Sequence, residues 1–511
     1  MMRPAVYLIG AGPGDPGLMT VHGLECLRAA DVVVYDHLVP RRLLRHARAD
    51  AELIDVGKAS PQPMAQDAIC YLLAEKVRDA KVVARLKWGD PFVFDRGGEE
   101  AFFLHEQGVP FEVVPGVPAA VAVPAYAGVP VTYPGGGDTI TLIRGHEDES
   151  RTLPPVDWAS LARLNGTVVC YAGAHQLPLL LDALQSSGWP ADGQAVIVYN
   201  GTLPQQETVS GTIAGLIDRL RVQPRHAPAT LVVGRVVGLR PHLRWFDSRP
   251  LFGRRVLVTR PRDQAVELVG RLTLLGADAI EAPFIRIEPP EDLGPLREAA
   301  AAPDAFDWIV FTSTNAVDAF MKALLEGDGD VRSMKGPRLC AVGPGTAARL
   351  SRYGFKVDLL PSEFRSEALA TAITAAGSVS GTRVLLPRAN IARDVVADQL
   401  RRAGAAVTDV VAYRTILNDT PRANEPDVYK LLLEGRIDVV TFASPSAARS
   451  FVTLYGAEAA TDLLEHTVVA VMGPATAEAT RQLGLPVTIQ PATSTIAGLV
   501  DAIAAHFTRG T

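Results

Sequence analysis

The sequence predicts an α/β protein in which each half of the chain forms two lobes. Up to about residue 245, short apolar runs alternate with helix-length segments, a pattern typical of a largely parallel sheet covered by helices. The proline- and glycine-rich stretch Pro130–Gly137 divides this half near residue 135. The rest of the chain repeats itself at an offset of about 130 residues, which indicates a duplicated α/β domain.

The composition favours folded domains and disfavours nucleic acids as partners. Of the 511 residues, 48% are hydrophobic and 21% are charged, enough for about three or four domains with sizeable cores. The net charge of −6 argues against general nucleic-acid binding, which needs a basic face. A local basic pocket for an acidic small molecule is compatible with it.

The cysteines point to a reducing compartment. No two of them have the C-x-x-C spacing, so we predict neither disulfides nor a metal site. No charged-then-apolar leader is visible, and no apolar run approaches ~18 residues. We therefore expect a cytoplasmic protein without a membrane partner. The cysteines are Cys26, Cys70, Cys170 and Cys340.

The apolar runs of the first half are its predicted strands, and a new strand opens the second half at Arg255–Thr259. The polar stretch Gly145–Pro155 between two of the runs is a predicted loop. The runs are Val6–Ile9, Asp31–Tyr35, Lys81–Leu86, Phe111–Val114, Thr139–Ile143, Thr167–Tyr171, Ala195–Tyr199 and Ala229–Val237.

The first run ends in a glycine-rich segment, Gly10–Gly17, which we call the opening loop. A helical pattern follows from about Thr20, so the segment predicts a strand, a loop and a helix whose N-terminus can meet a ligand. The loop is not a dinucleotide fingerprint, because Asp15 stands where the third glycine belongs and Pro13 stiffens the turn. This disfavours a nicotinamide oxidoreductase. A tight turn without a ligand is the alternative.

Further polar residues lie at or near predicted strand ends. Asp36 follows a strand and has the type of a general base, with a helix cap or an ion-pair partner as the alternative. Three cations could hold substrate carboxylates, or they could form a solvated face. They are Arg85, Lys87 and Arg96.

The duplication in the second half aligns three pairs of blocks. Asp307–Ala316 matches Asp438–Ala447, Ala341–Ala347 matches Val471–Ala477, and Arg255–Arg260 matches Arg383–Arg388. Turns at the ends of parallel strands bind ligands, and helix N-termini there favour anions. Two facing lobes would then make a cleft for a polyanion. The alternative is that the serines and threonines in these turns only cap helices.

An ordered set of motifs over residues 4–246 resembles uroporphyrinogen-III C-methyltransferase. The resemblance implies a two-lobed methyltransferase, with lobes of about 1–134 and 135–246, that binds S-adenosylmethionine between the lobes. It implies transfer of two methyl groups to uroporphyrinogen III, giving precorrin-2 for sirohaem or cobalamin, and a homodimer formed through this half. The motifs are GAGPGDPGLMT, VVVYDHLV, VGK, RLKWGDPFVFDRGGEE, VVPGVPAA, VYNGT and APATLVVGRVVGLR.

The same resemblance assigns residues to roles. Asp36 would accept a proton and Lys58 would donate one. The chain departs from the family at Trp88 and Asp95, where glycine is usual, at Pro118, where threonine is common, and at Ala172, where methionine is frequent. Trp88 would strain its turn or stack on the ligand, and weakened activity is the consequence to consider. The cofactor residues implied are Pro13, Trp88, Gly89, Asp90, Val93, Pro118, Ala119, Ala172 and Gly201.

After a linker over 247–252, residues 253–511 resemble uroporphyrinogen-III synthase through VLVTRP, FTSTNAV, AVGPGTA, LPRANIARD, VVAYRT, FASPSAA and VMGPATA. The resemblance implies cyclisation of hydroxymethylbilane with inversion of its last ring and without a cofactor. Lobe one would combine about 253–284 with 417–511, and lobe two would be about 285–416. Tyr413 would help the hydroxyl leave, and the cleft residues would be Ser313, Thr346, Ser444, Thr476, Arg260 and Arg388.

Together the two resemblances predict a bifunctional tetrapyrrole enzyme, in which one half makes the substrate of the other. Two alternatives stay open. The first half could methylate a later corrinoid intermediate, or it could be a catalytically weakened tetrapyrrole-binding module.

Overall fold

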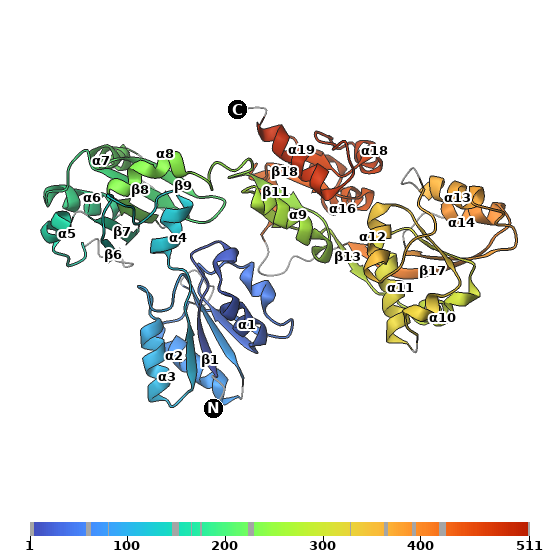
Figure 1. Ribbon diagram of the computed structural model, residues 1–511, viewed down its shortest axis with the longest axis horizontal. Coiled ribbons are helices and arrows are strands. Elements are labelled where there is room, and N and C mark those ends of the chain that lie inside the picture. Colours follow the sequence, from blue (N-terminus) through green and yellow to red (C-terminus); the bar gives the residue numbers. More distant parts are fainter. Residues whose placement is uncertain are drawn as a thin grey trace. The chain divides into compact units, whose positions relative to one another are not determined.

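The computed structural model describes residues 5–57, 63–79, 81–145, 153–164, 166–173, 176–222, 229–327, 329–361, 366–390, 395–417 and 426–508. The chain divides into two compact units. One is Met1–Val256 with Gly270–Ala279 and Val500–Thr511, and the other is Leu257–Val269 with Ile280–Leu499. The described strands form four sheets with helices against them, so the predicted α/β class is confirmed (Figure 1). The predicted domain limits stay predictions.

The first sheet is parallel, in the order β3-β2-β4-β1-β5. Its three central strands, β2, β4 and β1, are largely buried on both faces, as parallel strands usually are. Helix α1 (Val21–Ala29) covers one face, and helices α2 (Gln66–Arg78) and α3 (Gly97–Glu106) cover the other (Figure 1). The strands are β1 (Val6–Gly10), β2 (Val32–Tyr35), β3 (Glu52–Asp55), β4 (Val83–Lys87) and β5 (Phe111–Val114).

The second sheet has the order β6-β7-β10-β8-β9. Only β6 and β7 pair in parallel. The pairs β7/β10, β8/β10 and β8/β9 are antiparallel. The prediction of a largely parallel sheet is therefore wrong here, because β8 and β9 are joined by a short loop without a crossover helix. The strands are β6 (Ile140–Arg144), β7 (Thr167–Ala172), β8 (Gln194–Tyr199), β9 (Glu207–Thr212) and β10 (Ala229–Val233).

One predicted strand of this sheet is also too long. The run Ala229–Val237 leaves the sheet after Val233, and Arg235–Leu239 forms a 3-10 helix. Gly234 makes this change of direction possible, because its φ of 149° is a conformation that residues with a side chain rarely adopt.

Helices cover both faces of the second sheet. Helices α5 (Trp158–Leu164), α6 (Leu177–Ser186) and α7 (Ile213–Val222) share one apolar core with it. On the other face, α4 (Ala119–Tyr126) packs through Ala119, Ala120 and Val123. Helix α4 precedes the predicted lobe break near residue 135, yet it packs on the second sheet. Helix α8 (Arg240–Leu243) follows in sequence.

Strands of the second half form two more sheets. Strands β11 (Arg255–Val258), β12 (Asp278–Glu281), β18 (Val439–Phe442) and β19 (Val468–Val471) take the order β12-β11-β18-β19. The other sheet has the order β13-β17-β16-β14-β15 and is drawn from the middle of the sequence. Its strands are β13 (Ile285–Glu288), β14 (Trp308–Phe311), β15 (Arg338–Ala341), β16 (Arg383–Ala389) and β17 (Ala406–Leu417).

The duplication is visible in equivalent strand-to-helix turns. Ser313 caps α11 (Thr314–Glu326) and Ser444 caps α16 (Pro445–Tyr455), each accepting a hydrogen bond from a backbone N–H three residues on. Gly343 and Gly473 hold the same place before α12 (Pro344–Arg352) and α18 (Pro474–Gln482).

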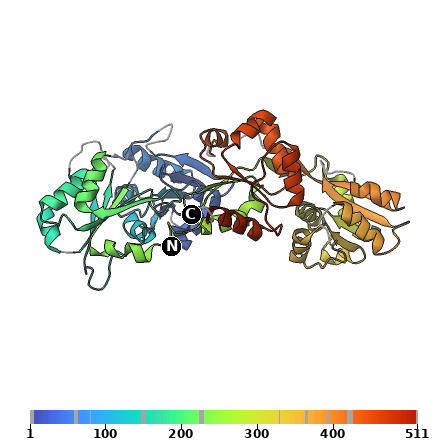
Figure 2. The same cartoon turned by 90° about the horizontal axis from the view of Figure 1, so that it is seen from above.

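The helices on the sheet β13-β17-β16-β14-β15 cover both of its faces. Helices α13 (Ser366–Ala375) and α14 (Val395–Arg402) share one core, and α10 (Gly294–Ala301), α11 and α12 share the other (Figure 2). None of the helices in the described ranges is long and apolar enough to cross a membrane. The remaining α-helices are α9 (Arg262–Leu274), α15 (Val428–Leu433), α17 (Ala457–Leu463) and α19 (Ile496–Thr508).

Candidate active sites

The opening loop is hydrogen-bonded to the turn that follows β4. Ala11 N donates to Lys87 O at 2.8 Å, and Gly12 and Gly89 exchange N–H···O bonds of 3.2 and 2.9 Å. Because β1 and β4 are adjacent parallel strands, their carboxyl ends lie at the same edge of the sheet. Two of the predicted cofactor segments, Gly10–Gly17 and Gly89–Asp90, therefore lie together.

The turn after β5 joins them through a close backbone approach. A Cβ at Gly10 would lie 2.5 Å from Gly116 Cα, and a Cβ at Gly116 would lie 2.2 Å from Gly89 O, so neither position accepts a side chain. Asp90 ties the turns, since its Oδ2 accepts from Gly116 N at 3.0 Å and its Oδ1 from Phe92 N at 2.8 Å. Asp90 thus holds backbone whatever else it binds.

Trp88 is free of the strain that its place in the turn suggested. Within the described part of the chain, the non-glycine residues with positive φ are Phe94, Asn200 and Thr202, and in the Trp88-Gly89 pair it is Gly89 that has a φ of 71°. The Trp88 indole donates from Nε1 to Pro13 O at 2.9 Å and meets Tyr171 edge-on at 6.2 Å. It connects the opening loop to β7 of the second sheet.

The second sheet also contacts the opening loop through the loop after β8. Asp15 N donates to Thr202 Oγ1 at 3.0 Å, and the Tyr126 hydroxyl donates to Asp15 Oδ2 at 2.8 Å. Burial and Asp15 raise the pKa of Tyr126, which keeps that hydroxyl a donor. A Cβ at Gly201 would lie 2.5 Å from Val123 of α4.

The remaining predicted cofactor residues lie around this junction or in the adjoining strand and loop. Pro118 and Ala119 begin α4, and a Cβ on Gly89 would lie 3.8 Å from Pro118 Cα. Ala172 is buried at the end of β7. Val93 is half-buried and its N–H donates to Asp90 O at 3.4 Å. The structure therefore brings Pro13, Trp88, Gly89 and Pro118 to one place.

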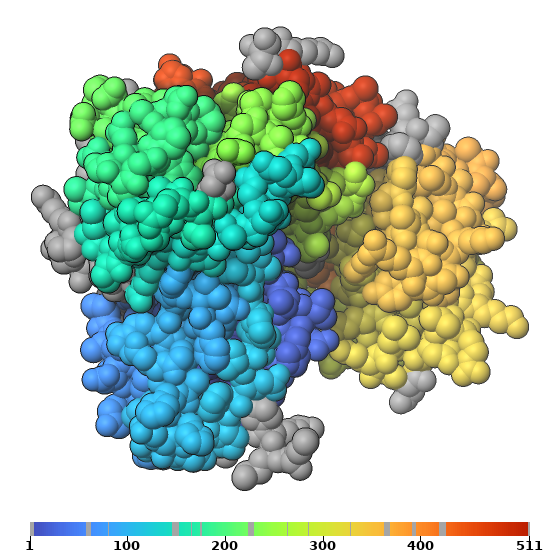
Figure 3. Space-filling model, turned by 60° about the vertical axis from the view of Figure 1, so that its left-hand side comes forward, coloured from blue at the N-terminus to red at the C-terminus, as the bar shows by residue number. Residues whose placement is uncertain are grey.

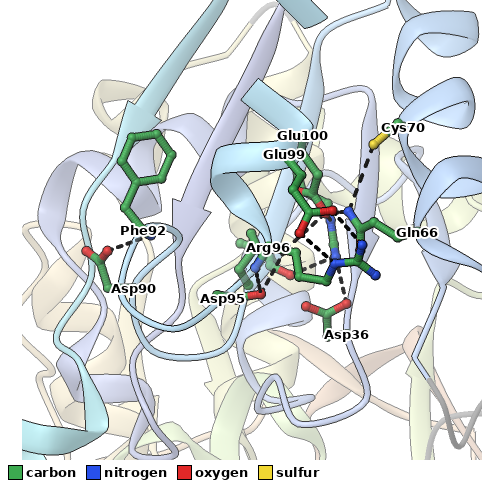
Figure 4. A network of polar contacts seen from close by, with 12 residues as sticks. Asp36, Gln66, Cys70, Asp90, Phe92, Asp95, Arg96, Glu99 and Glu100 are labelled. Carbon is green, nitrogen blue, oxygen red and sulfur yellow. Dashed lines mark hydrogen bonds and ion pairs between the residues drawn. The ribbon is translucent and has the colours of Figure 1, made fainter. Parts of the chain in front are cut away.

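A cluster of ionised side chains lies behind Asp36 (Figure 4). The carboxylate of Asp36 accepts from Arg85 Nη2 at 2.7 Å, and Arg85 Nε donates to Glu100 Oε1 at 3.2 Å. Lys87 Nζ lies 3.0 Å from Glu100 Oε1 and 3.1 Å from Asp95 Oδ1. We call these five residues the buried ion cluster.

Two of the three predicted substrate-binding cations are buried and paired with carboxylates of the chain itself. The Arg85 and Lys87 side chains are each 1% exposed, whereas that of Asp36 is 24% exposed. In Figure 3 the chain around residue 100 is coloured light blue. Arg96 is exposed and pairs with Glu99. Lys58, the predicted proton donor, lies outside the described residues.

The electrostatics keep Glu100 charged. Burial alone raises the pKa of Glu100, but Arg85 and Lys87 outweigh burial and hold it below its ordinary value. The pKa of Asp95 is raised, because burial there outweighs the attraction of Lys87. The pKa values of these two carboxylates therefore move in opposite directions. Asp95 and Glu100 were not predicted as site residues, because their contacts depend on packing across α3 and β4.

In the second half, Tyr413 of β17 meets the start of α11. Its hydroxyl lies 3.0 Å from Ser313 Oγ and is also hydrogen-bonded to Asn315. Burial raises the pKa of Tyr413 above its ordinary value, and the bonds to Ser313 and Asn315 offset only part of this. Tyr413 is therefore a protonated donor at neutral pH.

Sequence reasoning missed two amide side chains beside this pair. Gln264 Nε2 of α9 donates to Asn315 Oδ1 at 2.6 Å. Asn315 stands two residues after Ser313 in the duplicated turn, which was a signal that could have found it. Gln264 carries no such signal, because its partner is far away in the sequence.

The other predicted synthase residues occupy equivalent turns or ion pairs. Thr346 and Thr476 are buried in the first turns of α12 and α18, and Ser444 caps α16. Arg388 pairs with Asp409 of the neighbouring strand β17. Arg260 Nη2 lies 3.5 Å from Gln264 Oε1. Of the six predicted cleft residues, Ser313 is hydrogen-bonded to Tyr413 in the described part of the chain.

Comparisons with known proteins match a different protein family to each half of the chain. The family model described as Tetrapyrrole (Corrin/Porphyrin) Methylases matches residues 5–217. The model described as Uroporphyrinogen-III synthase HemD matches residues 266–501.

Curated relatives cover one half or both. Porphyrin biosynthesis protein HemD of Ruminiclostridium josui is 36% identical over 499 residues, 97% of each chain. Uroporphyrinogen-III C-methyltransferase of Bacillus subtilis is 37% identical over 359 residues, 70% of this chain and 73% of the relative. Uroporphyrinogen-III C-methyltransferase of Synechocystis sp. is 42% identical over 240 residues, 47% of this chain and 91% of the relative. The chain is a bifunctional tetrapyrrole enzyme of the family that joins a uroporphyrinogen-III C-methyltransferase to a uroporphyrinogen-III synthase.

Proposed function

We propose that the second half converts hydroxymethylbilane into uroporphyrinogen III, and that the first half transfers two methyl groups from S-adenosylmethionine to it, giving precorrin-2. The observation that carries the methyltransferase assignment is the meeting of three strand-end turns at the sheet edge where Asp36 follows β2. Membership of the family supports both halves.

The residues at this edge fit S-adenosylmethionine. The backbone at Gly10, Gly89 and Gly116 packs so closely that a Cβ at Gly10 or Gly116 would collide, which leaves main-chain groups facing the edge. Pro13, Gly89, Val93, Pro118, Ala119, Ala172 and Gly201 would hold the cofactor, and Asp90 would keep the turns in register. When bound, the cofactor supplies an electrophilic methyl group on its sulfonium.

Asp36 has the geometry of the proton acceptor. A pyrrole carbon that gains a methyl group must lose its proton, and a carboxylate at hydrogen-bond reach can take it. Arg85 fixes the Asp36 carboxylate from behind at 2.7 Å, so Asp36 is oriented before substrate arrives. We propose that Lys58 is the donor, and that Arg96 contributes to binding of substrate carboxylates.

For ring closure we propose that Tyr413 protonates the leaving hydroxyl. The bond from the terminal methylene to its hydroxyl breaks, water leaves, and the pyrrole carbon that attacks loses a proton afterwards. The raised pKa of Tyr413 keeps its O–H in place as the donor, and Ser313 and Asn315 orient it. Thr346, Ser444, Thr476, Arg260 and Arg388 are proposed to bind substrate carboxylates.

The methyltransferase half is tested with labelled S-adenosylmethionine and purified uroporphyrinogen III. We expect two labelled methyl groups per macrocycle. Label on added precorrin-2 but none on uroporphyrinogen III would support the later corrinoid substrate. No label on either would support the binding-module alternative.

The Trp88→Phe variant tests the cofactor edge. It removes the hydrogen bond to Pro13 O while keeping an aromatic ring, so we expect the free energy of unfolding to fall by about 1 kcal/mol and S-adenosylhomocysteine to bind more weakly. Trp245→Phe is the matched control, because Trp245 Nε1 donates to Ala125 O in the last turn of α4 at the same 2.9 Å. Urea unfolding and calorimetry measure the two effects. Equal loss of affinity in both variants would contradict the assignment.

We also propose a cytoplasmic location and a homodimer formed through the first half. The four cysteines are free and buried, which suits a reducing compartment.

A further inference from the structure

Glu100 of α3 is a carboxylate with no exposure to solvent. A buried charge is tolerated only when ion pairs and hydrogen bonds offset its desolvation, which costs several kcal/mol. Three donors surround Glu100: Arg85 Nε at 3.2 Å, Lys87 Nζ at 3.0 Å and Gln66 Nε2 at 3.0 Å. The donors come from β4 and α2, so Glu100 links three elements behind the candidate site (Figure 4).

The three bonds are distributed unevenly over the carboxylate. All of them end on Oε1, while Oε2 has no hydrogen-bond partner within the described ranges. If Glu100 only neutralised Arg85 and Lys87, the hydrogen bonds could be shared between its two oxygens. The position of this one oxygen therefore sets where Nε of Arg85 is held.

The guanidinium of Arg85 is held at each of its nitrogen atoms. Nε donates to Glu100, Nη1 donates to Leu86 O at 3.2 Å, and Nη2 donates to Asp36 at 2.7 Å. Because the guanidinium is planar and rigid, a shift at Nε displaces Nη2 as well. Glu100 and Asp36 are thus mechanically connected without touching.

We propose that Glu100 is a positioning residue for methyl transfer, which fixes Arg85 and through it the carboxylate of Asp36. The proposal rests on the proposed function, in which Asp36 accepts the proton. If Glu100 only stabilised the fold, the same contacts would be present. The test must therefore separate the orientation of Arg85 and Asp36 from the stability of the protein.

Two substitutions at Glu100 make this separation. Glu100→Asp keeps the charge but withdraws the oxygen by one methylene, and we expect kcat for methyl transfer to fall about 10- to 100-fold because the base is misplaced. Glu100→Gln keeps an oxygen for the three donors, but it removes the charge that is paired with Arg85 and Lys87, so we expect a lower thermal midpoint. We expect its kcat to stay within about threefold of the unchanged enzyme.

The KM for S-adenosylmethionine should change in neither variant, because Asp90 holds the cofactor turns independently. Glu106→Asp and Glu106→Gln are matched controls, since Glu106 is exposed on the same helix. They should leave kcat unchanged.

A second readout needs no turnover. In the full chain labelled with ¹⁵N-arginine, the Nε–H of Arg85 should exchange slowly with solvent in the unchanged protein and in Glu100→Gln, and quickly in Glu100→Asp. Arg85→Lys assigns the signal. Equal kcat in all Glu100 variants, or equal losses in Asp and Gln with lower thermal midpoints, would overturn the proposal. If the unchanged protein transfers no methyl group, the proposed function fails, while the exchange pattern still decides whether Glu100 orients Arg85.

Discussion

Asp36→Asn is expected to lower kcat for methyl transfer by about 10²- to 10⁴-fold, the range lost when a general base is removed. The asparagine keeps the size of the side chain and an oxygen for the Arg85 bond, but its amide cannot take up the proton. The measurement is the rate of label transfer from S-adenosylmethionine to uroporphyrinogen III.

Controls for this variant lie within the same chain. Ring closure of hydroxymethylbilane by the second half should be unchanged, as should the affinity for S-adenosylhomocysteine. Asp50→Asn makes the same chemical change at an exposed ion pair with Arg48 and should transfer label at the normal rate. An Asp36→Asn chain that methylates as fast as the unchanged protein would remove Asp36 from the mechanism.

Tyr413→Phe is expected to slow enzymatic ring closure by about 10²-fold, since it removes the donor to the leaving hydroxyl. The ring keeps its place in the core, but Ser313 and Asn315 lose the hydroxyl that they orient. The rate of uroporphyrinogen formation and the ratio of type-III to type-I product are measured together. We expect the ratio to shift towards the unrearranged type I.

Tyr353→Phe is the matched control for Tyr413. Its hydroxyl donates to Asp318 at 3.1 Å on α11, at a different place in the same core. It should leave ring closure unchanged, and both tyrosine variants should methylate supplied uroporphyrinogen III normally. An unchanged rate and product ratio in Tyr413→Phe would be incompatible with the proposed role.

Much of the first site follows from local sequence. The opening loop, the Gly89 turn and Asp36 each come directly after an apolar run, and parallel strands bring such ends to one edge. The burial of Arg85 and Lys87 could not be predicted in this way. Their alternation within β4 fits a half-exposed strand, and only the packing of α2 and α3 supplies Glu100 and Gln66 as partners.

In the rest of the chain, too, the features that the sequence did not predict depend on contacts between distant segments. Strand β9 has the polar sequence ETVSGT, which carries only a weak apolar pattern. It forms because it pairs with β8, and the sequence therefore did not predict it. The duplication located Ser313 and the other turn residues, because equivalent turns repeat in order. The contact between Gln264 and Asn315 joins two elements that the sequence places far apart, and no local pattern encodes it.

We propose that this one chain both makes uroporphyrinogen III and methylates it. The most direct measurement supplies hydroxymethylbilane and methyl-labelled S-adenosylmethionine to the full chain and analyses the macrocycle formed. We expect a type-III macrocycle that carries two labelled methyl groups, and unlabelled type-III product from Asp36→Asn. A type-III macrocycle without label from the unchanged chain, or labelled product only when precorrin-2 is added, would contradict it.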